Sequence, residues 1–200
     1  MESHKMYRRQ FIQSLIAAGI TVITERNAQA ARVKTSIRFL RPPGALAEDE
    51  FESRCIRCGQ CGEICPNRCI QFFSTENGLS SIDTPYIIPR EQACILCMKC
   101  GDICPTGAIQ KIEREAGTII QFVNMGLARV DKQLCLSYQG KTCGVCYRAC
   151  PLQDIAIKVG MLEQPIVSTA CVGCGLCERS CIQIPQAIRI IPVHESRQTT

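Results

Sequence analysis

The sequence predicts an α+β fold of two tandem modules, each built from short antiparallel strands and short helices. Three observations lead to this prediction. One cysteine pattern occurs four times in 200 residues, a short β-prone stretch follows each copy, and 17 cysteines stand beside only six phenylalanines, four tyrosines and no tryptophan. A chain this rich in cysteine need not bury a large apolar core, because bonds to sulfur replace burial as the main source of order.

The second copy of the cysteine pattern shows the chemistry that it serves. It reads Cys94-Ile-Leu-Cys97-Met-Lys-Cys100-Gly-Asp-Ile-Cys104-Pro105, or C-x2-C-x2-C-x3-C-P. Bacterial ferredoxins hold 4Fe–4S clusters with this run, in which the fourth cysteine binds the neighbouring cluster. Disulfide frameworks have more varied spacings, and a lone C-x-x-C pair would be less specific, since zinc knuckles and redox dithiols share it. The pattern therefore favours iron–sulfur clusters over disulfides and zinc.

The four copies together supply sixteen thiols, which is the number that four 4Fe–4S clusters require. The third copy departs most from the pattern, since seven residues separate its first two cysteines, and Ile182 replaces the proline of the fourth copy. A longer loop still permits ligation, because it can bulge while its ends stay close. The predicted ligands are Cys55, Cys58, Cys61, Cys65, Cys94, Cys97, Cys100, Cys104, Cys135, Cys143, Cys146, Cys150, Cys171, Cys174, Cys177 and Cys181.

The copies recur at a nearly constant interval. Their first cysteines are residues 55, 94, 135 and 171, which lie 39, 41 and 36 residues apart. A repeat of this length indicates one recurring supersecondary unit. Strand-like stretches follow the runs at 69–72, 108–111, 156–159 and 187–190, and precede the last three runs at 86–88, 127–130 and 165–168. Two such units make one bacterial-type ferredoxin module with two clusters.

Consecutive pairing of the units sets the predicted domain boundaries. Residues 51–116 form the first two-cluster module, and residues 117–200 form the second module with a C-terminal tail. In each module, the first three cysteines of one run and the fourth cysteine of the other run are expected to share a cluster. A nested arrangement, which pairs the two outer runs and the two inner runs, is the alternative.

Residues 1–30 resemble a twin-arginine export signal. Arg8-Arg9 is followed two residues later by phenylalanine, a modest apolar run extends over 15–23, and Ala28-Gln29-Ala30 fits a signal peptidase site. Clusters are assembled in the cytoplasm, so a cluster protein bound for the periplasm must be exported folded. We therefore predict a periplasmic protein exported folded by this route. An uncut signal that acts as an anchor and an ordinary amphipathic helix are the alternatives.

Residues 31–50 are expected to form an extended linker. They contain Arg41-Pro-Pro-Gly44, which favours extended backbone followed by a turn. A docking role for Arg38 and Arg41 is the second interpretation.

The seventeenth cysteine, Cys69, falls outside the repeated pattern. Aligning the first two copies places Cys65-Pro-Asn-Arg-Cys69 over Cys104-Pro-Thr-Gly-Ala108, so that Cys69 occupies an alanine position. We expect a small buried thiol there rather than a ligand or a redox switch.

Composition argues against several other functions. The net charge is +5, of which residues 1–30 contribute +2, and the rest is too mild to indicate nucleic-acid binding. No apolar stretch reaches the length of about 18 residues that a membrane span needs. Two histidines and no constellation of serine, cysteine or carboxylate groups give no support for catalysis on a small substrate. The chain is therefore not expected to be an enzyme or to have a membrane span of its own.

Several segments together resemble the NapG/MauM family of ferredoxin-type proteins. They are the twin-arginine leader and the stretches 41–46, 84–90, 125–128 and 135–151, the last of which has the long loop of the third run. The resemblance implies a periplasmic electron carrier with four 4Fe–4S clusters. In the NapG branch such a protein works beside a membrane-bound ferredoxin-type quinol dehydrogenase and passes electrons toward periplasmic nitrate reductase. In the MauM branch it accompanies the genes of methylamine dehydrogenase.

The predicted function is thus a relay of electrons from a membrane quinol dehydrogenase toward a periplasmic reductase or cytochrome. Three alternatives stay open. The chain is a tightly bound iron–sulfur subunit of a larger exported oxidoreductase, an accessory ferredoxin of methylamine dehydrogenase, or a zinc-binding structural or assembly protein.

Overall fold

The computed structural model describes residues 39–75 and 81–193. The predicted export signal, Arg38 and the end of the C-terminal tail lie outside the described residues. The chain divides into two units, Met1–Ile37 and Arg38–Thr200, and the second unit contains all four cysteine runs.

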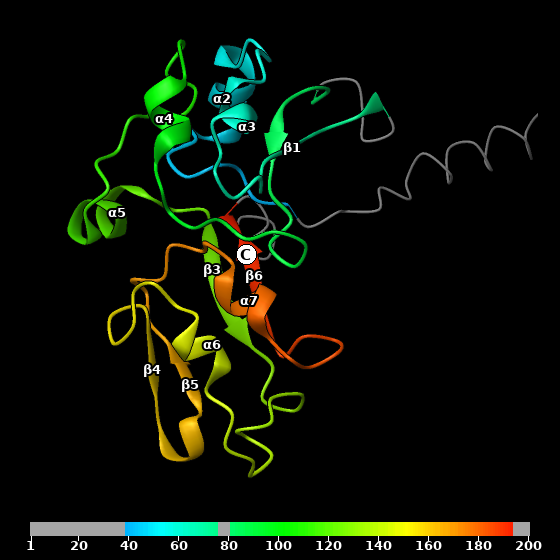
Figure 1. The fold of residues 1–200 in the computed structure, drawn as a ribbon, viewed down its shortest axis with the longest axis vertical. Coiled ribbons are helices and arrows are strands. Elements are labelled where there is room, and N and C mark those ends of the chain that lie inside the picture. The colour runs from blue at the N-terminus through cyan, green and yellow to red at the C-terminus, as the bar shows by residue number, and fades with distance from the viewer. Residues whose placement is uncertain (1–38, 76–80, 194–200) are drawn as a thin grey trace, which may run out of the picture. The chain divides into compact units, whose positions relative to one another are not determined.

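The described helices and strands are short, in agreement with the predicted α+β fold of short helices and short strands (Figure 1). The helices are α2 (Glu48–Arg54), α3 (Gln60–Glu63), α4 (Lys99–Ile103), α5 (Ala116–Phe122), α6 (Val145–Arg148) and α7 (Leu176–Ser180), with a 3-10 turn η2 (Met161–Glu163). The strands are β1 (Gln71–Phe72), β2 (Pro85–Tyr86), β3 (Gly126–Val130), β4 (Ile157–Val159), β5 (Pro165–Val167) and β6 (Ile188–Pro192).

The strands form three antiparallel pairs, β1 with β2, β3 with β6, and β4 with β5. Six of the seven strand-like stretches in the sequence overlap one of these strands. The exception is 108–111, where Ile109 makes only an isolated bridge with Ala45. The partner segment contains two prolines, which lack an N–H donor, so a longer ladder cannot form there.

The segment 39–47 is packed into the first module, which differs from the expected linker. The N–H groups of Leu40 and Ile87 each donate to the carbonyl oxygen of the other residue, at 2.8 Å. Farther along, the Gln110 N–H donates to the Gly44 oxygen at 2.8 Å. Leu40 is 1% exposed. This segment therefore pairs with the chain after the second run, much as β3 pairs with β6 after the fourth run.

Arg41 fixes this segment from within the fold. Its guanidinium donates to Thr84 Oγ1 at 2.9 Å and to the Pro85 oxygen at 2.7 Å, and it forms an ion pair with Glu48. The guanidinium carbon also lies 4.6 Å from the centre of the Phe51 ring. Arg41 is 7% exposed. Because a buried guanidinium needs such partners, Arg41 ties the start of the module to α2 and β2.

We expect the Arg41→Ala variant to be less stable than the wild type by about 3 kcal/mol, because Glu48 loses its cation and Thr84 its donor. Thermal unfolding under anaerobic conditions, followed by far-UV circular dichroism, measures the effect. Arg54→Ala is the matched control, since Arg54 pairs with Glu50 while 52% of its side chain is exposed. Its expected change is within about 0.5 kcal/mol. Equal melting temperatures for the two variants would show that 39–47 is a solvated linker after all.

The two modules share one hydrophobic core. Leu40, Ile87 and Leu96 from the first module belong to the same cluster of buried residues as Val172 and Ile188 from the second. A smaller cluster in the first module gathers Phe51, Cys61, Cys100, Ala108 and Ile109. Helix α5 lies across the boundary that the sequence predicts at residues 116 and 117. The described parts of the two modules, residues 39–75 and 81–193, thus form one packed body.

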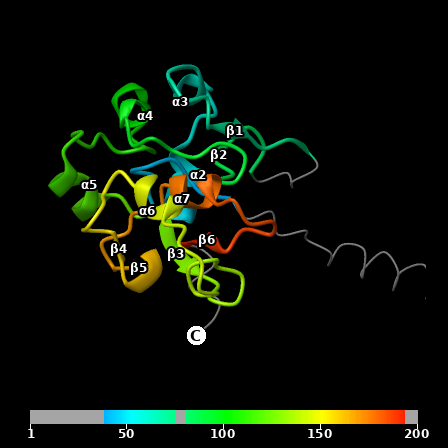
Figure 2. The same ribbon diagram turned by 60° about the horizontal axis from the view of Figure 1, so that its bottom comes forward.

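Helices α3 and α4 lie side by side, and so do α6 and α7, which Figure 2 shows from a second direction. Each of these four helices carries the third cysteine of one run. The fold therefore places the helices of the first and second runs together, and those of the third and fourth runs together. No helix among the described residues has the length and apolar character needed to cross a membrane.

Candidate iron–sulfur sites

Four cavities in the described part of the chain are lined by cysteine side chains, and we name each after the run that supplies three of its thiols. The first-run cavity contains Cys55, Cys58, Cys61 and Cys104; the second-run cavity contains Cys65, Cys69, Cys94, Cys97 and Cys100; the third-run cavity contains Cys135, Cys143, Cys146 and Cys181; the fourth-run cavity contains Cys150, Cys171, Cys174 and Cys177. This grouping is the one expected of consecutive pairing and differs from the nested alternative.

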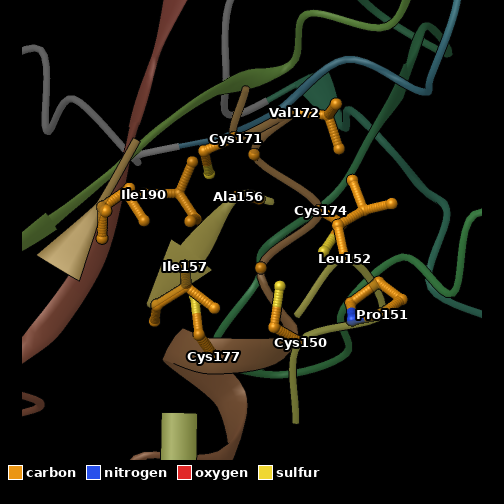
Figure 3. Close-up of a pocket in the computed structure, with 14 residues that line it drawn as sticks. Cys150, Pro151, Leu152, Ala156, Ile157, Cys171, Val172, Cys174, Cys177 and Ile190 are labelled. Carbon is orange, nitrogen blue, oxygen red and sulfur yellow. The ribbon is translucent and has the colours of Figure 1, made fainter. Parts of the chain in front are cut away.

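The fourth-run cavity shows how the thiols converge (Figure 3). The sulfur atoms of its four cysteines point into one space, which apolar side chains such as Leu152, Ile157 and Ile190 surround. Cys150 reaches this space from the run before it. The other three cavities likewise bring together three cysteines of one run and the fourth cysteine of its partner run, and the second-run cavity contains Cys69 as a fifth thiol.

Residues with left-handed backbone turn each run around its cavity. In the three regular runs the residue before the second cysteine has a positive φ: 59° at Arg57, 55° at Leu96 and 75° at Gly173. The residue after the second cysteine does so in all four runs: 75° at Gly59, 60° at Met98, 58° at Gly144 and 86° at Gly175. Left-handed backbone costs a residue with a Cβ about 1–2 kcal/mol. The fold accepts this cost at Arg57, Leu96 and Met98, where the chain must reverse for the sulfurs to converge.

Burial raises the pKa of several cavity thiols. It raises the pKa of Cys61 and Cys146 to about 11, and that of Cys100 and Cys174 to about 12, with neighbouring cysteines adding to the effect. Four thiolates in one apolar cavity repel each other, so these surroundings favour protonated sulfur as long as no metal is bound. Iron displaces these protons because a coordinating thiol is deprotonated outright. The donor set of each cavity therefore fits a 4Fe–4S cluster.

Backbone N–H groups donate to some of the sulfurs. The donors are Leu96 to Cys94 Sγ at 3.4 Å, Ile109 to Cys104 Sγ at 3.4 Å and Ala187 to Cys181 Sγ at 3.3 Å. At Cys104, burial raises the pKa, but hydrogen bonds from Ile109 and Thr106 outweigh it and lower the pKa overall. Hydrogen bonds to cluster sulfurs are one of the factors that set a reduction potential. These contacts therefore suit sulfurs that act as thiolates.

Cys69 makes the second-run cavity different from the others. It is 2% exposed, and its Sγ lies 3.6 Å from Cys65 Sγ. A hydrogen bond with Cys94 lowers the pKa of Cys69 to about 7. Alanines line the other three cavities at the corresponding point after the fourth cysteine, at residues 108, 156 and 187. Cys69 is thus the buried thiol that the alignment predicts, and it faces the same cavity as the predicted ligands.

We expect the Cys69→Ala variant to keep the full iron content of the wild type, because alanine stands at this point in the other three cavities. Iron and acid-labile sulfide analysis of the two proteins, purified side by side without oxygen, measures this. A loss of about four irons per chain would instead identify Cys69 as a ligand.

Comparison with known proteins agrees with the geometry of the cavities. The model of a 4Fe–4S dicluster domain matches residues 54–108, and a second such model matches residues 127–182. The two matches imply iron–sulfur clusters, two in each domain. The chain is 36% identical to the ferredoxin-type protein NapG of Escherichia coli (strain K12), with 93% of this chain and 86% of that protein covered.

The chain belongs to the NapG/MauM family of ferredoxin-type proteins. It is also 39% identical to the methylamine utilization ferredoxin-type protein MauM of Methylophilus methylotrophus, over 96% of this chain and 87% of that protein. NapG of Haemophilus influenzae is 37% identical, with 93% and 72% covered. The family resemblance of the sequence is thereby confirmed. Members of the NapG/MauM family are ferredoxin-type electron-transfer proteins, which fits a carrier rather than a catalyst.

Proposed function

We propose that the sixteen cysteines of the four runs bind four 4Fe–4S clusters and that this protein carries electrons between periplasmic partners. A bound 4Fe–4S cluster accepts and releases one electron at a time. The observation that carries the proposal is that each of four apolar cavities gathers three cysteines from one run and one from its partner run, with Cys69 as a fifth thiol in the second-run cavity. The protein's part is to hold these thiols in place and to exclude water from them.

The site of action in this proposal is the periplasm, reached in the folded state by the twin-arginine route. Residues 1–30 support it through the paired arginines, the modest apolar run and the cleavage site. The need to assemble clusters before export supports it independently. Appending residues 1–30 to a reporter that is active only when exported folded tests this part. Replacing Arg8 and Arg9 by lysine should abolish export of the reporter.

The donor in this proposal is a membrane-bound ferredoxin-type quinol dehydrogenase, and the acceptor is a periplasmic reductase of the nitrate reductase type or a cytochrome. These partners follow from the family resemblance. The second candidate is an accessory ferredoxin of methylamine dehydrogenase, which the 39% identity to a methylamine utilization protein favours. A tightly bound subunit of a larger exported oxidoreductase is the third.

Metal analysis tests the cofactor. Protein purified without oxygen should contain about sixteen irons and sixteen acid-labile sulfides per chain, which is four of each for every cluster. Zinc without acid-labile sulfide would overturn the proposal in favour of a zinc-binding structural protein.

Cross-linking in anaerobic cells, followed by mass spectrometry, tests the partners. A quinol dehydrogenase together with a periplasmic reductase supports the relay. An amine dehydrogenase would select the second candidate. A single catalytic subunit that remains bound in stoichiometric amount through purification would select the third.

A further inference from the structure

The second-run and fourth-run cavities meet at the contact between the two modules. The backbone N–H of Cys94, which lines the second-run cavity, donates to the carbonyl oxygen of Cys174, which lines the fourth-run cavity, at 3.0 Å. Leu96 and Met98 of the second run lie in the same hydrophobic cluster as Cys174 and Cys177. One peptide hydrogen bond therefore joins the walls of two cavities that belong to different modules.

Arg90 holds this junction from the side of the first module. Its Nη1 donates to the carbonyl oxygens of Glu178, Arg179 and Cys181 at 3.0, 3.1 and 2.9 Å. These carbonyls lie at the end of α7, where a helix has unpaired acceptors and favours positive charge. In return, the Arg179 guanidinium donates to the backbone oxygen of Glu91. Two arginines, one from each module, thus bind backbone carbonyls of the opposite module.

The backbones also approach closely beside these arginines. A Cβ added to Gly175 would lie 2.5 Å from Cβ of Pro89, which is nearer than real Cβ atoms come, and the φ of Gly175 is 86°. Gly175 lies directly after Cys174, and Pro89 directly before Arg90. The junction is therefore a fitted contact between the turn before the second run and the fourth run.

Among the described residues, the contacts that join the other two cavities to these two lie within their own modules. The third cysteines of the first and second runs, Cys61 and Cys100, lie in one small hydrophobic cluster, since α3 packs on α4. In the second module α6, which carries Cys146, packs on α7, which carries Cys177. The first-run and third-run cavities are thus the outer members of the series.

We infer, on the basis of the proposed function, that the four cluster sites form a single series in the order first run, second run, fourth run, third run, with Arg90 as the positioning residue at its centre. The order in space differs from the order in sequence, because the second module is joined through its last run. Between neighbouring sites one electron passes, and no atom or proton moves with it. The two ends of the series are the first-run and third-run sites.

Two double variants test the order, because paramagnetic clusters that lie close together split each other's electron paramagnetic resonance lines. Cys58→Ala with Cys143→Ala removes the outer sites, and Cys97→Ala with Cys171→Ala removes the inner sites. These four thiols are exposed or only partly buried, so their loss disturbs the core least. After full reduction we expect splitting between the two clusters left in the first variant and its loss in the second. Splitting in the second variant, or none in the first, would overturn the order.

A third variant keeps all four sites and so does not depend on the deletions being tolerated. Arg90→Ala should retain the wild-type iron content but lose part of the spin–spin interaction of the fully reduced protein. Lys111→Ala is the control, because the Lys111 side chain is 76% exposed and forms an ion pair with Asp102, away from the junction. An unchanged interaction in Arg90→Ala would overturn the positioning role. Absence of iron and sulfide from the wild type would instead refute the proposed function, so the two failures are distinguishable.

Discussion

The Cys65→Ser variant is expected to lose the second-run cluster and to keep the first-run cluster, although Cys65 belongs to the first run. Cys65 lines the second-run cavity with Cys94 and its neighbours, whereas Cys104 completes the first-run cavity. Cys65 is 8% exposed, so the variant replaces a proposed ligand by a serine hydroxyl that is largely shielded from water. Iron content should fall by about four per chain.

The mirror variant Cys104→Ser is the matched control for this experiment. It should lose the first-run cluster and keep the second-run cluster, because Cys104 belongs to the second run but lines the first-run cavity. Spectra of Cys58→Ala and Cys97→Ala, which each remove a ligand that stays with its own run, identify the signals of the two sites. If Cys65→Ser removed the same signal as Cys58→Ala, the exchange of ligands between runs would be wrong.

Cys69 complicates the interpretation of Cys65→Ser, since its sulfur lies 3.6 Å from that of Cys65. A nearby thiol that replaced the lost ligand would hide the effect. The double variant Cys65→Ser with Cys69→Ala removes this route and should lose about four irons per chain even if the single variant does not. A double variant with the full iron content would show that Cys65 does not bind the cluster.

The grouping of the thiols could be anticipated from the sequence because it is largely local. The spacers of two residues leave the chain few ways to turn, and left-handed residues such as Leu96 and Met98 supply the reversal. Only the fourth cysteine of each run involves a distant partner, and the knowledge that ferredoxins exchange it between runs covers that step. Motif spacing therefore predicts which sulfurs meet, whereas ligation itself stays a prediction for metal analysis.

The role of residues 39–47 could not be seen in the same way. Two adjacent prolines followed by a turn are typical of a connector. The segment pairs through a few backbone hydrogen bonds with Ile87 and Gln110, and such bonds produce no hydrophobic periodicity in the sequence. The repeat itself held a clue, since the last three runs are preceded by a strand-like stretch and the first run lacked one. When one copy of a repeat lacks an element that the other copies have, the segment at that place should be expected to pair in the same way even without a strand-like sequence.

The junction between the modules has no local signature at all. Cys94 and Cys174 are joined by a hydrogen bond between their backbones, so the type of side chain at either position does not indicate the contact. No sequence pattern marks Arg90 as a contact residue, because the three carbonyls at the end of α7 come near its guanidinium only once the chain is folded. Long-range contacts of this kind depend on the packing of whole units rather than on residue patterns.

Removal of iron is expected to unfold residues 39–193, and this is the largest effect that the structure predicts. The strands have two to five residues, and a pair of such short strands is not stable by itself in water. The main hydrophobic cluster contains Cys65, Cys94, Cys174 and Cys177, so many of its contacts depend on side chains that face the cavities. Without iron, these thiols line four cavities with nothing to fill them.

Anaerobic treatment with an iron chelator, followed by far-UV circular dichroism and limited proteolysis, measures this dependence. We expect loss of the ordered spectrum together with the iron, and rapid cleavage throughout the two modules, because binding free energy at such sites is folding free energy. A sample carried through the same steps with iron-saturated chelator controls for the treatment itself. Partial removal of iron is informative as well. Because the two modules share one hydrophobic core, loss of iron from one module should make both modules susceptible to protease. Iron-free protein that still unfolds cooperatively would mean that apolar side chains such as Leu40, Phe51 and Ile87 suffice to hold the fold.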